Sequence, residues 1–451
     1  MRTYYLRTFG CQMNEHDAER IRYALEAEGL VAVRTPHEAD VLVYNTCTVR
    51  RSADERLAGH LSLAARLKRE DPRRIVLLTG CLPQAEREGL FARFPFVDGA
   101  LGPQNLHRLP ELLRMATAPA GRASGPPGRP GFFEDGPVLS GCLPGRRARP
   151  HQAWVQVMSG CSNFCAYCIV PHVRGPERSR PADEIVAEVA ALVADGVREV
   201  TLLGQNVNAY GRDLGAAGAP AAPSFAALLR RLDAETGVAR LRFMTSHPKD
   251  LSDELIAAVA ELGSVCEHVH LPLQSGSDRI LAAMNRGYTV ERYLERVAAL
   301  RAAVPEVALT TDLIAGFPGE TDDDVAATLA AVDAAGVEGA FTFVFSPRRG
   351  TAAAGYPDQV PEAVRRDRVE RLIARTQGLA LAAHRRWVGR VAEVLVEGPS
   401  RRGPTLRGRT RQNVTVDFAG TARPGAIVDV EITAATSTTL RGRLSRGPQG
   451  R

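Results

Sequence analysis

Short apolar runs alternate with amphipathic segments over the first 115 residues of the chain. Such runs predict buried strands, and apolar residues at helical spacing between them predict helices that pack on a sheet. Strands that alternate with helices favour a parallel α/β fold, so we expect residues 1–115 to form one such domain. The predicted strands are residues 3–10 (TYYLRTFG), 39–48 (ADVLVYNTCT) and 73–81 (RRIVLLTGC), and the predicted helices are residues 14–29 and 52–71.

The alternation stops between residues 116 and 150, where glycine and proline are frequent and a linker is predicted. It resumes over residues 151–384. Helical segments there separate six strand candidates, which are AWVQVMSG, REVTLLGQN, RLRFMTSH, EHVHLPLQS, ALTTDLIAGF and GAFTFVFSP. Six such units favour a (β/α)6 partial barrel over a flat sheet, with its chemistry at the carboxyl ends of the strands.

The pattern changes again near residue 385, after which short strand candidates are separated by turn residues. This pattern predicts a small antiparallel β-barrel over residues 385–451. The segment carries 13 arginines and 5 acidic residues, whereas the whole chain has a net charge of only +6. A basic terminal domain is typical of proteins that bind a polyanion, although a surface charged for solubility gives the same composition.

Composition narrows the class of protein. A hydrophobic content of 45% is ordinary for a globular chain. No run of about 18 apolar residues is present, so we expect no membrane helix and no membrane partner. The polar beginning of the chain does not resemble a signal peptide, and we therefore expect a cytoplasmic protein. Because thiols stay reduced in that compartment, the 8 cysteines favour metal binding or catalysis over disulfides.

Three cysteines lie close together in the stretch GCSNFCAYCIVPHVRGPERSR. Cys161, Cys165 and Cys168 follow the first predicted barrel strand, where a catalytic loop is expected. No fourth ligand with zinc-like spacing follows them. Three thiolates on a [4Fe–4S] cluster would leave one iron open to a substrate or cofactor. A partial zinc knuckle and plain buried thiols are the alternatives.

Three more cysteines, Cys11, Cys47 and Cys81, lie at or directly after the ends of the three strands predicted in the first domain. The ends of neighbouring parallel strands lie side by side, so these thiols can converge at one edge of the sheet. We expect them to hold a second cluster with an open position, although each one alone is equally typical of a small buried residue. Cys142 and Cys266 fit neither set, and we interpret both as incidental thiols.

These motifs resemble those of the radical S-adenosylmethionine methylthiotransferases, and the resemblance covers essentially the whole chain. GQNVNAYG and LPLQSGS are similar to the branch that modifies tRNA, since the other branches differ there. The chain departs from the family in its long Pro-rich linker and in FSPRRGT, where YSPRPGT is usual. The stretches that carry the resemblance are CSNFCAYCIVPHVRGPERSR, LLGQNVNAYG, HLPLQSGSDRILAAMNRGYT, TDLIAGFPGET and RGRTRQNVTVDF.

The resemblance implies two ligand sets and a terminal barrel of the type called TRAM. The open iron of the radical cluster would bind S-adenosylmethionine, and the catalytic agent would be that bound molecule rather than a side chain. The implied ligands are Cys161, Cys165 and Cys168 for the radical [4Fe–4S] cluster, and Cys11, Cys47 and Cys81 for the auxiliary [4Fe–4S] cluster.

The resemblance also implies a reaction, the methylthiolation of C2 of N6-isopentenyladenosine at position 37 of tRNA. Two S-adenosylmethionine molecules would be used in each turnover. One would methylate a sulfur bound at the auxiliary cluster, and the other would give the 5′-deoxyadenosyl radical that removes the C2 hydrogen. The implied partners are the tRNA anticodon stem-loop and a reductant of the flavodoxin or ferredoxin type, and we expect a monomer.

Polar and glycine residues at further strand ends are candidates for binding S-adenosylmethionine. Glycine permits close approach of the backbone to a ligand, and amide side chains supply donors and acceptors. Ordinary turns followed by helix caps would use the same residues, and we expect Glu320 also to fix a neighbouring arginine. The candidates are Tyr167, Gly204, Gln205, Asn206, Gln274, Ser275, Gly316 and Glu320.

Arg407, Arg409 and Arg411 alternate through a predicted strand and would therefore share one face. Guanidinium groups suit phosphates and splayed bases, so these are the candidate RNA-binding residues, with Arg401, Arg402 and Arg441 beside them. Such binding would weaken steeply with salt, whereas a solvated surface would bind no RNA. In RGPERSR, Glu177 would brace the cluster loop or meet the substrate.

Other functions fit the sequence. An aspartate of a ribosomal protein, or another modified adenosine of tRNA, would be a substrate for the same chemistry. A non-catalytic iron–sulfur protein that binds RNA would instead have fully coordinated clusters and would not cleave S-adenosylmethionine. A zinc protein would be colourless, whereas iron–sulfur clusters are brown.

Overall fold

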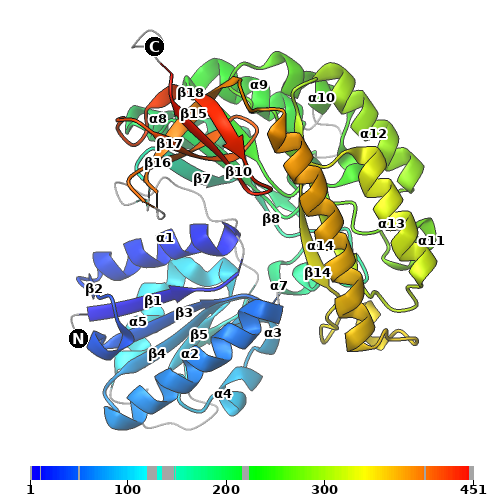
Figure 1. Ribbon diagram of the computed structural model, residues 1–451. Helices are drawn as coiled ribbons and strands as arrows, with labels where there is room; N and C mark the ends of the chain where they lie inside the picture. Colours follow the sequence, from blue (N-terminus) through cyan, green and yellow to red (C-terminus); the bar gives the residue numbers. More distant parts are fainter. Residues whose placement is uncertain are drawn as a thin grey trace. The chain divides into compact units, whose positions relative to one another are not determined.

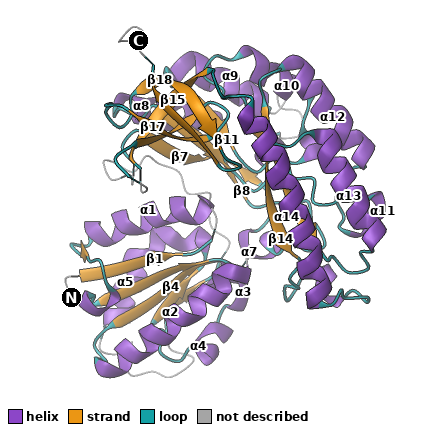
Figure 2. Ribbon diagram, viewed as in Figure 1, coloured by secondary structure: helices purple, strands orange, loops and turns teal. Residues whose placement is uncertain are grey.

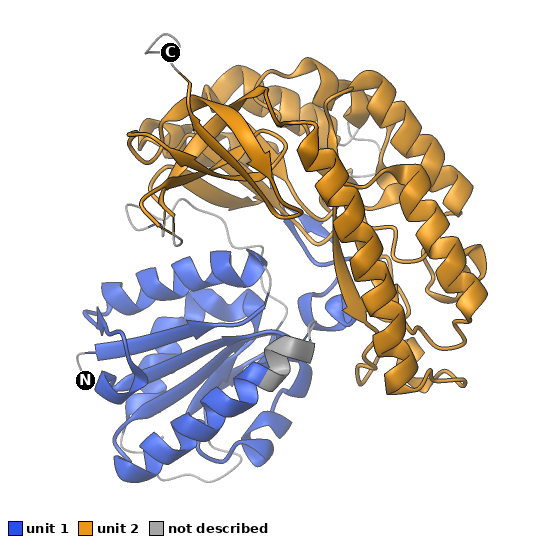
Figure 3. Ribbon diagram, viewed as in Figure 1, with its two compact units in different colours: residues 1–148, 158–162, 168–180 blue, residues 149–157, 163–167, 181–451 orange. Residues whose placement is uncertain are grey.

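The computed structural model describes residues 3–10, 12–48, 51–118, 129–134, 147, 149–215, 223–400 and 403–445, without the side chains of residues 51–55. Two compact units make up the chain (Figure 3). Unit 2 contains both the predicted (β/α)6 barrel and the predicted terminal barrel. The boundaries expected at residues 115, 150 and 384 stay predictions. Unit 1 comprises Met1–Ala148, Met158–Ser162 and Cys168–Arg180, and unit 2 comprises Arg149–Val157, Asn163–Tyr167 and Pro181–Arg451.

Unit 1 is built on a sheet with the strand order β2-β1-β3-β4-β5-β6, and every pairing in it is parallel (Figure 1). β3 and β4 are buried along their whole length, which explains their continuous apolar runs. The predicted parallel α/β fold is confirmed. The strands are β1 (Thr3–Thr8), β2 (Val31–Ala32), β3 (Val41–Thr46), β4 (Ile75–Gly80), β5 (Gly99–Leu101) and β6 (Gly131–Phe132).

Helices cover both faces of this sheet (Figure 2). α1 (Gln12–Ala27) and α5 (Leu109–Thr117) pack on one face, and α2 (Arg51–Glu70) and α4 (Gly89–Arg93) pack on the other. Each fully buried aliphatic side chain of these helices contributes roughly 1.5–3 kcal/mol. The sheet is thus held from both sides, while its carboxyl edge remains available for a site.

β6 lies within the segment that we predicted to be a linker. Its residues pair with β5, through Ala100 with Gly131 and Leu101 with Phe132. The apolar residues Phe132 and Phe133 are buried, one in the core of each face of the sheet. This strand was not predicted from the sequence, because glycine and proline surround its short apolar group.

Unit 2 contains parallel strands in the orders β11-β10-β7 and β12-β13-β14, and a parallel bridge from Leu241 to Val265 links the two groups. All six predicted strands are present, so the predicted partial barrel of strand and helix units is confirmed. They are β7 (Gln152–Gln156), β10 (Glu199–Leu203), β11 (Arg240–Phe243), β12 (His268–His270), β13 (Ala308–Ala315) and β14 (Gly339–Val344).

The helices of this barrel lie outside its strands (Figure 1). Several begin with a serine or threonine whose hydroxyl accepts a backbone N–H of the first turn, as Ser277 and Thr321 do. Such caps fix the turn that follows each strand, and these turns carry the candidate site. The helices are α8 (Ala182–Ala194), α9 (Phe225–Thr236), α10 (Asp253–Glu261), α11 (Asp278–Ala283), α12 (Val290–Ala303), α13 (Asp322–Ala335) and α14 (Glu362–Arg385).

The terminal part of unit 2 is a closed β-barrel in the order β15-β16-β17-β19-β18, around a core that includes Val416 and Phe418. The pairing is antiparallel as predicted, except that β17 and β19 are parallel. This exception arises because β18, which separates them in sequence, lies on the other side of β19. The strands are β15 (Val391–Pro399), β16 (Leu406–Thr410), β17 (Thr415–Ala419), β18 (Ile427–Ala435) and β19 (Thr439–Leu444).

Four further short elements flank the candidate sites. α3 (Cys81–Glu86) starts where β4 ends, and α7 (Val170–Arg174) follows the loop with three cysteines. β8 (Met158–Ser159) and β9 (Arg178–Ser179) pair on either side of that loop. Across the described residues, no helix combines the length and the apolar character that a membrane span needs.

Candidate cluster, cofactor and RNA sites

The cysteines of unit 1 follow strands that are neighbours in the sheet. The last register pair of β3 and β4 is Thr46 with Gly80, and Cys47 and Cys81 are the next residues of those strands. The structure therefore brings Cys47 and Cys81, both buried, to one edge of the sheet. Cys11 lies outside the described residues, but the preceding Gly10 lies so close to Cys47 that an added Cβ would come within 3.1 Å of its Sγ.

A buried amide network fixes this edge. Asn14 Nδ2 donates to Asn45 Oδ1 at 3.2 Å and to the Thr46 carbonyl at 2.9 Å, and Asn45 Nδ2 donates to the Asn14 carbonyl at 2.8 Å. Thr46 Oγ1 donates to the Thr79 carbonyl at 2.7 Å. Gly80 has a φ of 94°, and a Cβ there would clash with the Thr46 carbonyl oxygen. The residue before Cys81 must therefore be glycine.

Hydroxyl groups at the same edge fit an iron–sulfur cluster. The Oγ1 atoms of Thr8, Thr48 and Thr79 are buried and have no hydrogen-bond partner among the residues described. They lie at or just after the ends of β1, β3 and β4, like the cysteines themselves. A buried hydroxyl without a partner is unfavourable, and the sulfur atoms of a cluster are acceptors that would satisfy it. The role of the three cysteines as ligands stays a prediction.

The loop with the other three cysteines is shared between the units, since Cys161 and Cys168 group with unit 1, and Cys165 and Tyr167 with unit 2. On the side of unit 1, Cys161 N–H donates to the Gly175 carbonyl at 3.1 Å. Gly160 has a φ of 75°, and a Cβ there would clash with the Pro176 carbonyl oxygen. A glycine with positive φ thus precedes Cys161, just as Gly80 precedes Cys81.

Glu177 braces this loop, which was one of its two expected roles. Its Oε1 accepts the Ser162 N–H at 3.3 Å, and its own N–H donates to Ser162 Oγ at 3.2 Å. The two residues therefore hold each other through a reciprocal pair of hydrogen bonds. The carboxylate acts here on the backbone of the loop.

On the side of unit 2, the segment 284–288 holds the middle of the same loop. Ala166 N–H donates to the Met284 carbonyl at 2.9 Å, and Asn285 Nδ2 donates to the Phe164 carbonyl at 3.0 Å. One guanidinium nitrogen of Arg286 lies 3.3 Å from Cys165 Sγ. Arg286 was not among the residues predicted from the sequence, and the only signal for it was a charged residue within the stretch HLPLQSGSDRILAAMNRGYT.

The candidates for binding S-adenosylmethionine lie at the carboxyl ends of barrel strands. Gly204 and Gln205 follow β10, Gln274 follows β12, and Gly316 follows β13. Gln274 has a φ of 69°, and its backbone bonds to Asp312 and Ile314 on the neighbouring strand. The structure thus places these residues on strand ends as predicted, while their role as cofactor ligands stays a prediction.

Some candidates are engaged within the protein. Asn206 Nδ2 donates to Asp250 Oδ2 at 2.8 Å, and Ser275 Oγ accepts the Ser277 N–H at 3.2 Å. Glu320 Oε2 accepts the Gly316 N–H at 2.7 Å and an N–H of Arg368 at 3.1 Å, so the expectation that Glu320 fixes an arginine is confirmed. Burial nevertheless raises the pKa of Glu320, against the effect of these two donors.

Unsatisfied polar atoms at the same strand ends suit a polar ligand. In the described chain they have no hydrogen-bond partner although they are buried. Amide oxygens, a hydroxyl and an imidazole match the amino, carboxylate and ribose groups of S-adenosylmethionine, so the residues present fit this cofactor. The atoms are Gln205 Oε1, Asn206 Oδ1, Ser246 Oγ, His247 Nε2 and Gln274 Oε1.

His247 is neutral in this site. Burial, together with Arg286, Lys249 and Arg212 nearby, lowers its pKa to about 2. Nδ1 accepts the Lys249 N–H at 3.3 Å, so the proton of the neutral ring resides on Nε2. The unsatisfied Nε2–H is therefore a donor that faces no other described residue within hydrogen-bond distance.

No group of three or more His, Cys, Asp or Glu side chains in the described chain is arranged to hold a metal ion. Cys142 and Cys11 both lie outside the described residues. Cys266, which we interpreted as an incidental thiol, is buried, and burial raises the pKa of its thiol.

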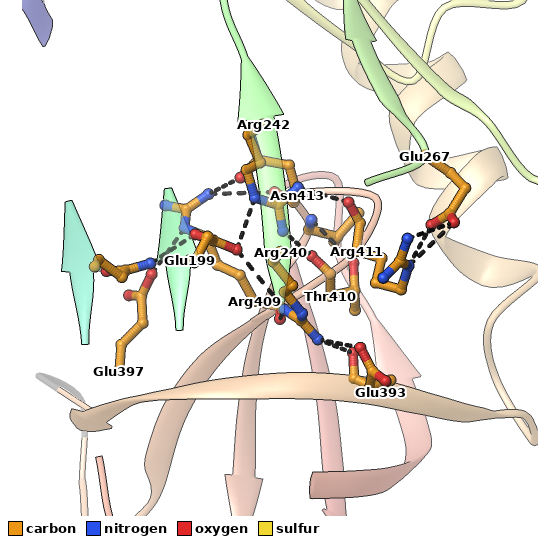
Figure 4. A network of polar contacts seen from close by, with 12 residues as sticks. Glu199, Arg240, Arg242, Glu267, Glu393, Glu397, Arg409, Thr410, Arg411 and Asn413 are labelled. Carbon is orange, nitrogen blue, oxygen red and sulfur yellow. Dashed lines mark hydrogen bonds and ion pairs between the residues drawn. The ribbon is translucent and has the colours of Figure 1, made fainter. Parts of the chain in front are cut away.

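The candidate arginines of the terminal barrel each contact a carboxylate, and Figure 4 shows these contacts for Arg409 and Arg411. Arg407 donates to Asp417 at 2.8 Å, Arg409 to Glu397 at 3.0 Å, and Arg411 to Glu267 at 2.8 Å. Arg407 and Arg409 share one face of β16, as predicted from their alternation. Arg411 follows the strand and extends to Glu267 and the Val265 carbonyl beside β12. Arg401 and Arg402 lie outside the described residues, and Arg441 is exposed.

Two buried arginines of β11 hold the hairpin of β16 and β17 (Figure 4). Arg242 donates to Glu199 Oε2 at 2.8 Å and to the carbonyls of Thr410 and Arg411 at 2.7 and 2.6 Å. Arg240 donates to Glu393 Oε1 at 2.7 Å and to the Arg409 carbonyl at 2.9 Å. Burial raises the pKa of Glu199, but Arg242 and Arg240 together bring it below its ordinary value.

Comparison with known proteins covers all three parts of the chain. The Radical SAM superfamily model matches residues 155–332, the model of uncharacterized protein family UPF0004 matches residues 3–102, and the TRAM domain model matches residues 385–445. A structure of the radical S-adenosylmethionine methyltransferase TsrM from Kitasatospora setae is similar with a TM-score of 0.56 and 16% identity. The match covers 78% of this chain and 77% of that one, and it supports the fold.

Curated relatives are similar over nearly the full length. A protein of Moorella thermoacetica is 45% identical over 99% of both chains. A protein of Acidothermus cellulolyticus is 47% identical over 96% of this chain and 86% of the relative. Both relatives are named tRNA-2-methylthio-N(6)-dimethylallyladenosine synthase.

Proposed function

Since the chain belongs to the tRNA-2-methylthio-N(6)-dimethylallyladenosine synthase family, we propose that it adds a methylthio group to C2 of N6-isopentenyladenosine at position 37 of tRNA. The C2–H bond is unactivated, and no side-chain base removes its hydrogen. The chemistry therefore depends on cofactors that the protein binds and orients. The observation that supports the proposal is the position of Cys47 and Cys81 at the ends of neighbouring parallel strands, together with the single loop that contains Cys161, Cys165 and Cys168.

We assign the auxiliary cluster to residues 1–115 and the radical cluster to residues 151–384. When bound, the two [4Fe–4S] clusters and S-adenosylmethionine supply the radical and the sulfur for this chemistry. The protein's own part is to leave one position open at each cluster by providing three thiolates. The proposed ligands are Cys11, Cys47 and Cys81 for the auxiliary cluster, and Cys161, Cys165 and Cys168 for the radical cluster.

The strand ends of the barrel orient S-adenosylmethionine in this proposal. His247 Nε2–H supplies a neutral donor, and Gln205 and Gln274 supply amide oxygens that have no other described partner. Glu320 contributes indirectly, because it fixes the turn at Gly316. Desolvation of these groups lets each hydrogen bond to the cofactor form without competition from water.

The terminal barrel binds the anticodon stem-loop in this proposal. Arg407 and Arg441 flank Asp417 in register on neighbouring strands, so they present guanidinium groups on one surface of the barrel. Arg411 anchors the hairpin through Glu267 to the segment that precedes β12. We further propose that the protein works in the cytoplasm and takes single electrons from a flavodoxin or a ferredoxin.

This function is tested by comparing the activity of the enzyme on three candidate substrates. The reconstituted enzyme is incubated with S-adenosylmethionine and dithionite, together with stem-loops carrying N6-isopentenyladenosine or threonylcarbamoyladenosine, or with a ribosomal protein. We expect methylthio addition to the isopentenylated stem-loop alone, measured by nucleoside mass spectrometry. Modification of either other substrate at a higher kcat/KM would contradict the proposal.

A further inference from the structure

The guanidinium of Arg286 is held from several sides inside unit 2. Its Nε donates to Tyr288 Oη at 3.1 Å, one terminal nitrogen donates to the Pro272 carbonyl at 3.1 Å, and the other lies 3.3 Å from Cys165 Sγ. Tyr288 Oη is itself tied to the carbonyls of Pro272 and Leu273. These contacts fix the planar group so that one edge faces the Cys165 thiol.

Arg286 is 5% exposed, and its position is unusual for a buried arginine. A buried guanidinium remains charged and normally has a carboxylate partner, since an unpaired buried charge is strongly destabilising. Among the residues described, the partners of Arg286 are a phenol, a carbonyl and a thiol. Five other buried arginines contact carboxylates: Arg174 with Asp17, Arg240 with Glu393, Arg242 with Glu199, Arg296 with Asp253 and Arg368 with Glu320.

Arg286 has no carboxylate partner among the described residues, and a cluster bound at Cys165 would supply the negative charge. A thiolate at Cys165 would compensate the guanidinium, and reduction of a cluster adds a further negative charge next to it. Hydrogen bonds to cluster sulfurs and local positive charge raise the reduction potential, because they stabilise the reduced form more than the oxidised form. A higher potential makes the cluster easier to reduce by an external one-electron donor such as a flavodoxin or ferredoxin.

We propose that Arg286 is a positioning residue that donates an N–H···S hydrogen bond to the Cys165 thiolate of the radical cluster and raises the reduction potential of that cluster. This inference rests on the proposed function, because it requires a cluster at Cys165. It assigns no new step to the reaction, and the electron still comes from the external reductant.

The test is a redox titration of a single cluster. Cys47→Ala and Cys81→Ala are combined to remove the auxiliary cluster, and Arg286→Lys or Arg286→Gln is added to this parent chain. Electron paramagnetic resonance follows reduction of the remaining cluster. We expect the equilibrium constant for reduction to fall at least tenfold in R286Q, which is about 59 mV for one electron, and to fall less in R286K, which keeps the charge.

Arg296→Gln is the matched control, because Arg296 is also buried but pairs with Asp253. We expect its potential to equal that of the parent. A potential of R286Q equal to the parent's, at equal iron content, would overturn the inference and leave the proposed function intact. A parent chain that binds no cluster through Cys165 would overturn both.

If R286Q does not assemble its cluster, a measurement on the parent chain tests the inference instead. The parent chain is labelled with 15N-arginine, and pulsed electron paramagnetic resonance is recorded on its reduced cluster. We expect a 15N hyperfine coupling from the guanidinium, and we expect R286K to lack it. A spectrum of the parent without this coupling would overturn the inference.

Discussion

The two cysteine sets of this chain are placed by different means. Cys47 and Cys81 come from separate strands, and they meet at one edge because Thr46 and Gly80 are in register. Cys161, Cys165 and Cys168 come from one loop, and their short spacing brings them together along the chain. The first set depends on the topology of a sheet, whereas the second depends on a local motif with support from other segments.

Because different contacts hold the two cysteine sets, different substitutions should disrupt each set. The edge of the sheet is held by buried strands and by hydrogen bonds between the amides of Asn14 and Asn45. The loop has no regular structure between β8 and α7, and its residues are held by Glu177 within unit 1 and by Asn285 and Arg286 within unit 2. We expect damage to the sheet to affect sulfur chemistry and damage to the loop to affect radical formation.

The largest expected effect separates the two sets directly. Cys165→Ala should abolish 5′-deoxyadenosine formation, because the proposed function places S-adenosylmethionine on the cluster of that loop. Cys81→Ala should keep 5′-deoxyadenosine formation but abolish methylthio transfer, because the proposed auxiliary cluster supplies the chemistry of that step. Liquid chromatography of both products measures this, and equal loss of both products in C81A would contradict the comparison.

The next effect concerns the glycines that precede a cysteine in each set. Gly80→Ala and Gly160→Ala each force a Cβ against a backbone carbonyl at positive φ. We expect each to destabilise the chain by about 1–3 kcal/mol through strain, with G80A losing the auxiliary cluster and G160A the radical cluster. Gly29→Ala is the control, since Gly29 has a φ of 80° but no atom near the added Cβ. Iron content and thermal unfolding measure these effects, and equal behaviour of G80A and G29A would refute them.

A smaller effect distinguishes the arginines of the terminal barrel. Arg411→Ala should lower stability by about 0.5–1.5 kcal/mol, because it breaks partly exposed hydrogen bonds to Glu267. Arg441→Ala should leave stability unchanged and weaken stem-loop binding, with the slope of log affinity against log salt falling by about 0.7–0.9. Thermal unfolding and fluorescence anisotropy at several salt concentrations measure the two effects. Loss of RNA affinity in R411A with unchanged stability would contradict the structural role of Arg411 and assign it to RNA binding.

The smallest effect is a pH dependence at Glu199. Its folded pKa lies below its ordinary value of 4.5, because Arg242 and Arg240 outweigh the effect of burial. The stability that it contributes is therefore present above about pH 4.5 and is lost as the pH falls through the folded pKa. We expect the thermal unfolding midpoint of the chain to decrease as the pH is lowered below 4.5. In Glu199→Gln this decrease should be smaller. An identical acid profile in both chains would contradict this account.

Much of the fold followed from the sequence, because buried parallel strands appear as apolar runs and helices as periodic segments. The strand ends with Cys47 and Cys81 were predictable for the same reason. The contact of Arg286 with Cys165 and the pairing of Arg411 with Glu267 were not, because they join residues more than 100 positions apart. Periodicity reports which face of an element is buried, but not which side chain of another element lies against it.

The most direct test of the account is a Mössbauer spectrum of the reconstituted 57Fe enzyme, before and after addition of S-adenosylmethionine. We predict two [4Fe–4S] clusters per chain, and a change at one iron of the radical cluster when S-adenosylmethionine binds. Cys81→Ala should remove one cluster without removing that change. A spectrum with one cluster per chain, or with clusters that S-adenosylmethionine does not perturb, would contradict the account.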